Sequence, residues 1–167
     1  MQVMQRLQLP VQKKTGKNPT NRGRLGSKRS ILTDGKGIPL SIVVAAANIR
    51  DFKLMHETLA SIILKRPNPK WVHQNLLADK DYSNQESRKI AAKMGYDAHI
   101  PQKENEKIKI PRHPGRRKAR RWVVEQTFGG LNRDRSIFTR WEKDPENYEA
   151  FLQIAAGILC FNRSRRK

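Results

Sequence analysis

The apolar positions of the chain first become regular near Lys28. The β-branched runs SKRSILTD and IPLSIVVAA flank residues 34–37, which read DGKG. Aspartate and glycine tolerate the backbone angles of a tight turn, so this pattern predicts a β-hairpin. Asp34 is therefore predicted as a turn residue rather than a catalytic one. The preceding stretch KKTGKNPTNRGRLGSK is rich in glycine, asparagine and lysine and predicts an exposed basic loop.

A helix is predicted after the hairpin, with Asp51 as its N-cap. Its apolar residues Met55, Leu59, Ile62 and Ile63 recur at i, i+4, i+7 and i+8, the spacing of one helix face.

A strand–helix–strand unit is predicted over residues 76–100. The run NLLAD is short and apolar and ends in an acid, while YDAHIPQK predicts a second strand. Ser83 and Glu86 between them form a capping box, and Gly95 closes the helix. Such a unit implies a parallel strand pair with a right-handed crossover.

Two further helices are predicted after the basic, proline-containing stretch 103–121. The first carries Glu125 and is weakened near its end by the pair Gly129 and Gly130. Asp144 as N-cap and Pro145 as first residue open the second. Its apolar stripe, more typical of core than of a cofactor site, consists of Tyr148, Phe151, Leu152, Ala155 and Leu159.

The length and charge of the chain limit its class. Its 167 residues fit one domain, and 35 Lys+Arg against 15 Asp+Glu give a net charge of +20, which attracts polyanions such as nucleic acid. We expect a basic segment over 1–27, a domain over 28–162 and a basic tail over 163–167. No apolar run reaches the length of a membrane span, so we expect a cytoplasmic protein with Cys160 reduced.

Two acids stand out against this positive charge. Asp79 ends a predicted strand, where ligands of open α/β sheets usually bind, and Glu125 follows Arg121 by one helical turn. Carboxylates that converge in space are the ligands that Mg²⁺ or Mn²⁺ takes. Alternatively, Asp79 is a strand-end cap and Glu125 forms a weak helix pair with Arg121. The residues alone leave both interpretations open.

Several stretches resemble a known family in their content and order: TGKNPTNRG, KRSILTDGKGIPLSIVVAAANIRD, DKDY and KARRWVVEQTFGGLNRDRSIFTRWEK, followed by Tyr148. Together they resemble bacterial insertion-sequence transposases, the DDE enzymes with an RNase H-like catalytic domain. The resemblance begins near Thr15 and covers almost all of the remaining chain. It implies an α/β fold with a mixed sheet flanked by helices, in which Asp79 and Glu125 are the second and third catalytic acids and ligands of Mg²⁺ or Mn²⁺.

The resemblance also implies DNA as the partner, specifically the terminal repeats of an insertion sequence, and a homodimer associated with the nucleoid. Arg121 would contact a phosphate, a role that its bidentate guanidinium suits. The side chains expected to bind DNA are Arg117, Lys118, Arg120, Arg121, Arg133, Arg135, Arg140 and Lys143.

Three departures from the family pattern matter. Asp81 stands where the family has a small residue, and the cation expected two turns after Glu125 falls near Asn132, with Arg133 adjacent. The first aspartate of the triad should lie on a strand before Thr15, yet the first 33 residues contain no acid. This central strand is therefore expected to be missing, or replaced by a substitute strand with alternating Val3, Leu7, Leu9 and Val11.

The resemblance thus predicts an incomplete transposase, impaired in DNA cleavage and strand transfer when alone. It would be an N-terminally truncated relic, or the downstream half of an element expressed as two reading frames. The main alternative is a non-catalytic nucleic-acid-binding protein, and a nuclease without specific end recognition is a third.

Overall fold

The computed structural model describes residues 14–19, 22–101 and 122–165. Its strands are β1 (Gly16–Lys17), β2 (Leu25–Thr33), β3 (Pro39–Ala46), β4 (Asn75–Leu77) and β5 (Asp97–His99). Its helices are α1 (Asp51–Ala60), the 3₁₀ helix η1 (Lys80–Tyr82), α2 (Gln85–Lys93), α3 (Trp122–Leu131), α4 (Arg135–Phe138) and α5 (Pro145–Ser164). The predicted α/β class is confirmed.

The strands form two small sheets within these ranges. One is antiparallel with the order β1-β2-β3, and its central pairs include Ile31 with Ile42 and Ser30 with Val43. The other pairs β4 with β5 in parallel, in register from Asn75 with Asp97. The predicted parallel pair is therefore confirmed, with α2 as its connection.

The hairpin turn between β2 and β3 is held by Asp34, as predicted. Its carboxylate accepts hydrogen bonds from the backbone N–H of Lys36 at 2.9 Å and of Ile38 at 2.8 Å. Gly37 has a φ of +81°, a conformation that favours glycine, and its N–H donates to the Asp34 carbonyl at 3.0 Å. The turn thus uses Asp34 to satisfy backbone donors.

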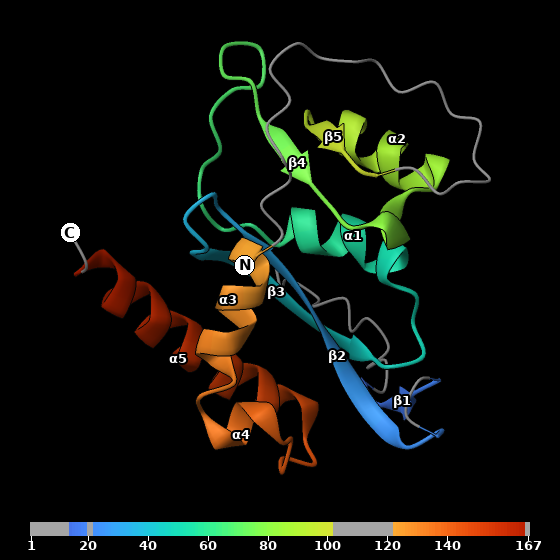
Figure 1. The fold of residues 1–167 in the computed structure, drawn as a ribbon, viewed down its shortest axis with the longest axis vertical. Helices are drawn as coiled ribbons and strands as arrows, with labels where there is room; N and C mark the ends of the chain where they lie inside the picture. Colours follow the sequence, from blue (N-terminus) through green and yellow to red (C-terminus); the bar gives the residue numbers. More distant parts are fainter. Residues whose placement is uncertain (1–13, 20–21, 102–121, 166–167) are drawn as a thin grey trace, which may run out of the picture.

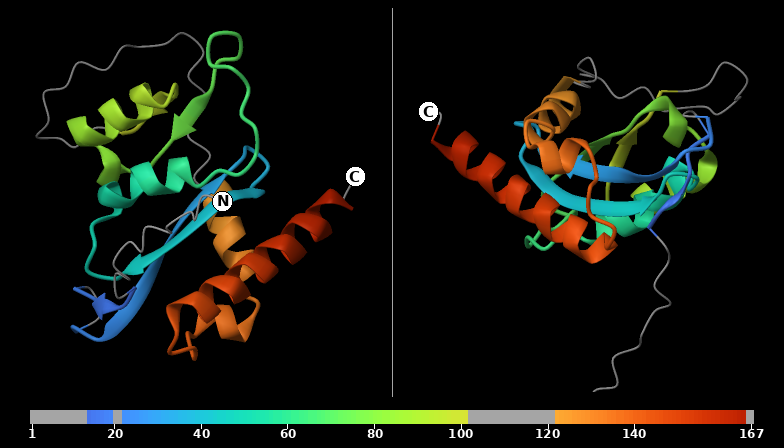
Figure 2. Two further views of the ribbon diagram at one scale, coloured as in Figure 1. Left: turned by 180° about the vertical axis from the view of Figure 1, so that it is seen from behind. Right: turned by 90° about the horizontal axis from the view of Figure 1, so that it is seen from below.

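Helices cover both faces of the β2–β3 hairpin (Figures 1 and 2), and alternating residues of the hairpin contact different helices. On one face, Ile31 and Ile42 pack with α3, α4 and α5 in a core cluster whose buried members are Val44, Leu131, Ile137, Tyr148 and Leu152. On the other face, Leu32 packs with α1 and the β4–α2–β5 unit in a second cluster, whose buried members are Met55, Leu59, Leu76, Ala91 and Ile100. The hairpin therefore separates two layers of helix.

Two predicted helix starts are wrong by one residue. The N-cap of α1 is Arg50, and Asp51 is the first helical residue, where its carboxylate pairs with Lys28 at 2.7 Å. The N-cap of α2 is Asn84 rather than Ser83, and its side chain accepts from the N–H of Ser87 at 2.8 Å. Ser83 is unsuited to cap α2 because it ends η1, with its own N–H bonded to the Lys80 carbonyl.

Three predicted element lengths are also wrong. Helix α1 ends at Ala60, so Ile63 does not extend its apolar face and is 96% exposed. Strand β4 ends at Leu77, two residues before Asp79. The predicted basic loop before Lys28 contains β1 and the start of β2, because Asn18 and Gly23 turn the chain between them through hydrogen bonds of 2.8 and 3.1 Å.

Helix α5 begins as predicted. Asp144 accepts from the N–H of Glu146 at 3.0 Å, and Pro145 is the first helical residue. Of the predicted stripe, Phe151 is 42% exposed and lies outside the core, while the others pack in the first cluster. In the part of the chain that the structure describes, no helix has the length and apolar character needed to cross a bilayer.

Candidate functional site

Asp79 lies two residues beyond the carboxyl end of β4, which the sequence predicted to end at Asp79 itself. It is the N-cap of η1, and its carboxylate accepts a hydrogen bond from the N–H of Lys80 at 2.6 Å. Its carbonyl accepts from the N–H of Tyr82 at 3.0 Å. The residue is exposed, so capping fixes its backbone while the side chain remains accessible to solvent.

A polar network ties η1 to the hairpin and to α1. The hydroxyl of Tyr82 forms a hydrogen bond with Ser30 of β2. Ser30 in turn accepts from Thr58 Oγ1 at 2.7 Å, and that hydroxyl also lies 2.7 Å from the Leu54 carbonyl. Because Tyr82 ends the 3₁₀ turn that Asp79 begins, this network positions Asp79 relative to the sheet.

Tyr82 also lies within an acidic environment. Burial raises the pKa of its hydroxyl above the ordinary value of 10.0, and the negative charge of Asp51 raises it further. Asp79 and Asp81 act in the same direction, whereas the hydrogen bond to Ser30 lowers the pKa. The tyrosine thus remains neutral at ordinary pH.

Glu125 lies in the first turn of α3, where its negative charge is favourable to the helix dipole. The face of α3 opposite Glu125 is the one that packs against the rest of the protein. Its residues Val123, Thr127 and Leu131, which lie at successive turns, are buried. Glu125 itself is exposed.

The hairpin turn anchors this helix. Thr127 Oγ1 donates to the Gly37 carbonyl at 2.6 Å, and Arg163 of α5 also donates to that carbonyl. Arg163 reaches the Lys36 carbonyl at 3.2 Å as well. The turn that Asp34 shapes therefore joins α3 to α5.

Arg29 is a residue of this region that the sequence did not single out. Its guanidinium lies 5.5 Å from the centre of the Phe128 ring and donates through Nη2 to Asn132 Oδ1 at 2.9 Å. Phe128 and Asn132 follow Glu125 at i+3 and i+7, so Arg29 lies along the face of α3 that carries Glu125. Its Nη1 is buried and has no hydrogen-bond partner among the described residues. The alternation of β2 places residue 29 on the α3 face, but only the structure shows what it contacts.

The described residues do not by themselves form a metal site. Hard divalent cations take oxygen ligands from several groups. Within 14–19, 22–101 and 122–165, no three His, Cys, Asp or Glu side chains gather in a way that could hold an ion. The donor set therefore does not fit a divalent ion without a further ligand.

The residues expected to bind DNA fall into three groups. Arg117, Lys118, Arg120 and Arg121 lie outside the described residues. Arg133, Arg135 and Lys143 are exposed, and none of them has a side-chain partner within the described part of the chain. Asp134, the acid between the two arginines, caps α4 by accepting from Ser136 at 3.0 Å.

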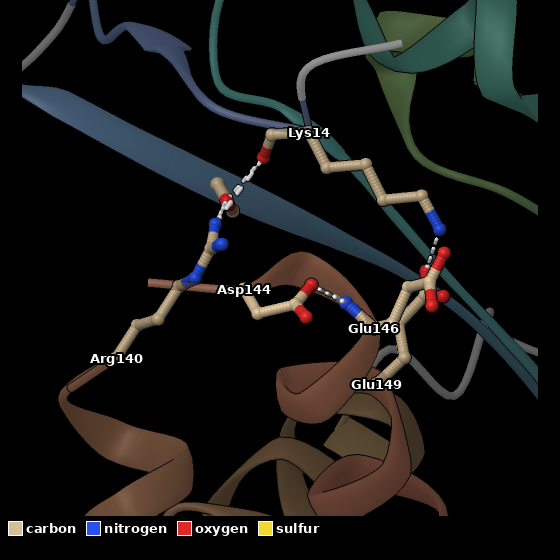
Figure 3. A network of polar contacts seen from close by, with 6 residues as sticks. Lys14, Arg140, Asp144, Glu146 and Glu149 are labelled. Carbon is tan, nitrogen blue, oxygen red and sulfur yellow. Dashed lines mark hydrogen bonds and ion pairs between the residues drawn. The ribbon is translucent and has the colours of Figure 1, made fainter. Parts of the chain in front are cut away.

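Arg140 differs from these three because its guanidinium is bound within the chain (Figure 3). It donates to Thr15 Oγ1 at 3.0 Å, to the Glu142 carbonyl at 2.9 Å and to Ser27 Oγ, and it lies 5.3 Å from the Tyr148 ring. Beside it, Lys14 forms an ion pair with Glu149 of α5. These contacts fasten the loop before α5 to the edge of the sheet.

Comparisons with known proteins identify the family of the chain. The family described as "Transposase DDE domain" matches residues 5–161. A Burkholderia cepacia protein, named as a transposase for insertion sequence element IS402, is 31% identical over 156 residues, which cover 92% of this chain and 71% of that protein. No solved structure gives a significant match. With a match across nearly its whole length, the chain belongs to the DDE transposase domain family.

Proposed function

We propose that this chain is a DNA transposase domain of the DDE type, incomplete on its own, in which Asp79 and Glu125 are the second and third acids of the DDE triad. The family implies DNA as its partner and generally a divalent metal ion as its cofactor. The observation that carries the proposal is the placement of these two acids on separate elements of one α/β domain. Both are exposed; Asp79 caps η1 through the N–H of Lys80, and the helix that carries Glu125 is anchored through Thr127.

An RNase H-like arrangement is part of the same proposal. It is supported by the antiparallel hairpin β2–β3, the parallel pair β4–β5 and the helices on both faces of the hairpin. In that arrangement a central strand lies between β2 and β4. The described strands form two separate sheets, and residues 1–12, where the first strand is expected, lie outside the described residues.

DNA binding is proposed to involve the exposed cations that follow α3. Arg133, Arg135 and Lys143 present positive charge that no described acid neutralises. Arg117, Lys118, Arg120 and Arg121 add four charges immediately before α3 in the sequence. Phosphate contacts of this kind give affinity without sequence preference and make binding strongly dependent on salt.

Catalysis by the chain alone is proposed to be impaired. The described residues gather no three metal-ligating side chains, and the first 33 residues of the sequence supply no acid. The same observation favours the second candidate function, a nucleic-acid-binding protein without catalytic activity.

Supercoiled plasmid DNA tests the proposal and distinguishes the two candidates. The chain should shift the plasmid in a gel, with an affinity that falls steeply between 50 and 200 mM salt, by about 10³-fold or more if six or more phosphates are contacted. With Mg²⁺ or Mn²⁺ the chain alone should not nick the plasmid above background. Nicking that both Asp79→Ala and Glu125→Ala abolish would show that the chain completes its own catalytic site. Affinity that does not change with salt would contradict the nucleic-acid function itself.

A homodimer is the expected state of the chain on DNA, because a transposase joins two ends. Sedimentation with and without a DNA fragment measures this. A monomer in both conditions would contradict the expectation and leave DNA binding unaffected.

A further inference from the structure

The connection between α1 and β4 carries an exposed tryptophan on an ordered loop. Trp71 is 83% exposed and Val72 is 48% exposed, although both belong to residue types that usually bury apolar surface. The connection is visible in Figure 1 as the segment that extends beyond β4 and returns to it. Neither residue belongs to either core cluster.

The loop is closed by side-chain hydrogen bonds at its base. Arg66 donates to Gln74 Oε1 through Nε at 3.0 Å and through Nη2 at 2.9 Å, and Gln74 Nε2 donates to the Pro67 carbonyl at 2.8 Å. Arg66 also bonds to the Met94 carbonyl at 3.1 Å and stacks on Tyr96, 3.8 Å from the ring centre. These contacts fix both ends of the loop to the β4–α2–β5 unit.

The tip of the loop is also ordered. The carbonyl of Asn68 accepts from the N–H groups of Trp71 and Val72 at 3.0 Å each, and its side chain accepts from the N–H of Lys70 at 3.0 Å. A tip of this kind loses little conformational entropy when a ligand binds, because it is already in one conformation.

The charge of the connection favours an anionic partner. Residues 58–78 contain no Asp or Glu and include Lys65, Arg66 and Lys70. The nearest acid in the contacts of the loop, Asp97, is paired with His73. Lys70, which is exposed, is therefore the cation next to the exposed Trp71 in the sequence.

We propose that Trp71 and Lys70 form a binding site for single-stranded DNA, in which the indole stacks on an unpaired base and the ammonium group contacts the adjacent phosphate. Aromatic side chains in a positive setting bind unpaired bases because every base has a π-face. A base inside a duplex is already stacked and does not offer that face. This inference rests on the proposed DNA-binding function and adds a second contact to it.

The site lies at the opposite end of β4 from Asp79. Trp71 precedes Asn75 by four residues, and Asp79 follows Leu77 by two. Eight fully extended residues span at most about 29 Å, which is close to the length of roughly eight nucleotides of one strand at 3.4 Å each. A strand opened at Asp79 would therefore reach Trp71 within one short single-stranded segment.

Fluorescence anisotropy with a labelled 12-nucleotide oligothymidine tests the site, with a fully paired hairpin duplex measured in parallel. Trp71→Ala should weaken binding to the single strand about fivefold or more, as removal of one stacked base does, and change duplex binding by less than about twofold. Trp71→Phe should recover part of the affinity. Lys70→Ala should lower the salt slope for the single strand by roughly one.

Ile63→Ala is the matched control, because Ile63 is 96% exposed in the same connection and has no aromatic ring. It should leave the affinity for both probes unchanged. A second readout uses an oligonucleotide with 5-bromodeoxyuridine, which should crosslink on irradiation to the tryptic peptide 71–80. A crosslink in another peptide would contradict the assignment.

The outcomes separate this inference from the proposed function. Equal single-strand affinity in the parent chain and Trp71→Ala would overturn the site while duplex binding continued to support the transposase function. If Trp71→Ala instead abolishes self-association and leaves DNA affinity unchanged, the loop is a protein contact and the inference is wrong. If the parent chain binds neither probe, the DNA-binding function fails as well.

Discussion

Asp79 and Glu125 are supported from opposite faces of the same hairpin, and by different kinds of contact. The turn that Asp79 begins is held by hydroxyl groups, which run from Tyr82 through Ser30 to Thr58. The helix that carries Glu125 is held mainly by apolar side chains packed against the sheet and α5. One support is a short polar chain, and the other is a core cluster.

Because of this difference, substitutions in the supporting contacts should affect the positions of Asp79 and Glu125 in different ways. A hydroxyl network loses about one hydrogen bond at a time, so its weakening is gradual and local. When one side chain of a core cluster is shortened, a cavity remains and the neighbouring side chains lose their packing contacts. The resulting loss of stability affects every element that packs in the cluster. Removing single groups from each face tests the comparison.

The largest effect is expected from Leu152→Ala. Leu152 is 1% exposed and packs in the cluster that holds α3 and α5 to the sheet. Its truncation should lower the free energy of unfolding by about 2–5 kcal/mol. Urea denaturation followed by circular dichroism measures the change. Ile158→Ala on the same helix is the control, because Ile158 is 55% exposed, and a comparable loss there would contradict the assignment of faces.

Arg140 provides the next test, because it is a cation that stabilises the fold rather than one that faces solvent. Arg140→Lys keeps the charge but loses the planar group that bonds to Thr15, Ser27 and Glu142, so unfolding free energy should fall by about 1–3 kcal/mol. Arg135→Ala should change stability by less than about 0.5 kcal/mol and lower the salt slope of DNA binding by roughly one. The reverse pattern would show that the roles of these two arginines have been exchanged.

A pair of isosteric substitutions compares the two faces directly. Thr58→Val removes the hydroxyl that bonds to Ser30, and Thr127→Val removes the one that bonds to the Gly37 carbonyl. Each should cost about 0.5–1.5 kcal/mol in chemical denaturation. Only Thr58→Val should disturb Tyr82, which near-UV circular dichroism detects. Equal near-UV changes in both variants would contradict separate supports.

The smallest effect is expected from Tyr82→Phe and appears at high pH. Burial raises the pKa of Tyr82 in the folded state, so the folded protein holds this proton more tightly than the unfolded chain does. The resulting stability is present below the unfolded pKa near 10 and is lost as pH rises through the folded value. Unfolding free energy should therefore fall less above pH 10 in Tyr82→Phe than in the parent chain. Identical pH profiles would contradict the burial of the hydroxyl.

Much of the fold could be predicted because its signals are local. The Asp-Gly turn, the Asp144–Pro145 helix start and the parallel pair around α2 each depend on a few neighbouring residues. The predictions were wrong where contacts beyond the local sequence pattern determine where a helix begins or ends. Ser83 fits a capping box, but η1 uses it first, so the cap moved to Asn84. Residue 63 continues the helical spacing, yet α1 ends before it.

The elements that carry Asp79 and Glu125 were predictable from the sequence, but the contacts that support these elements were not. Asp79 and Glu125 have recognisable sequence neighbours. In contrast, Arg29 meets Asn132 across 103 residues and Arg140 meets Ser27 across 113. No local pattern distinguishes an arginine that stabilises a fold from one that faces solvent. The assignment of Asp79 and Glu125 to catalysis therefore remains a prediction for the nicking assay.

The Gly37 carbonyl has a consequence for how the chain folds during synthesis. Its two side-chain partners, Thr127 and Arg163, lie 90 and 126 residues further along the chain. The β2–β3 hairpin can form early from local contacts, whereas docking of α3 must wait for residues that leave the ribosome much later. Until then, one apolar face of the hairpin, including Ile31, Ile42 and Val44, stays uncovered. The nascent protein thus passes through a period in which an aggregation-prone sheet face is exposed. This period of exposure ends only when Arg163 has emerged.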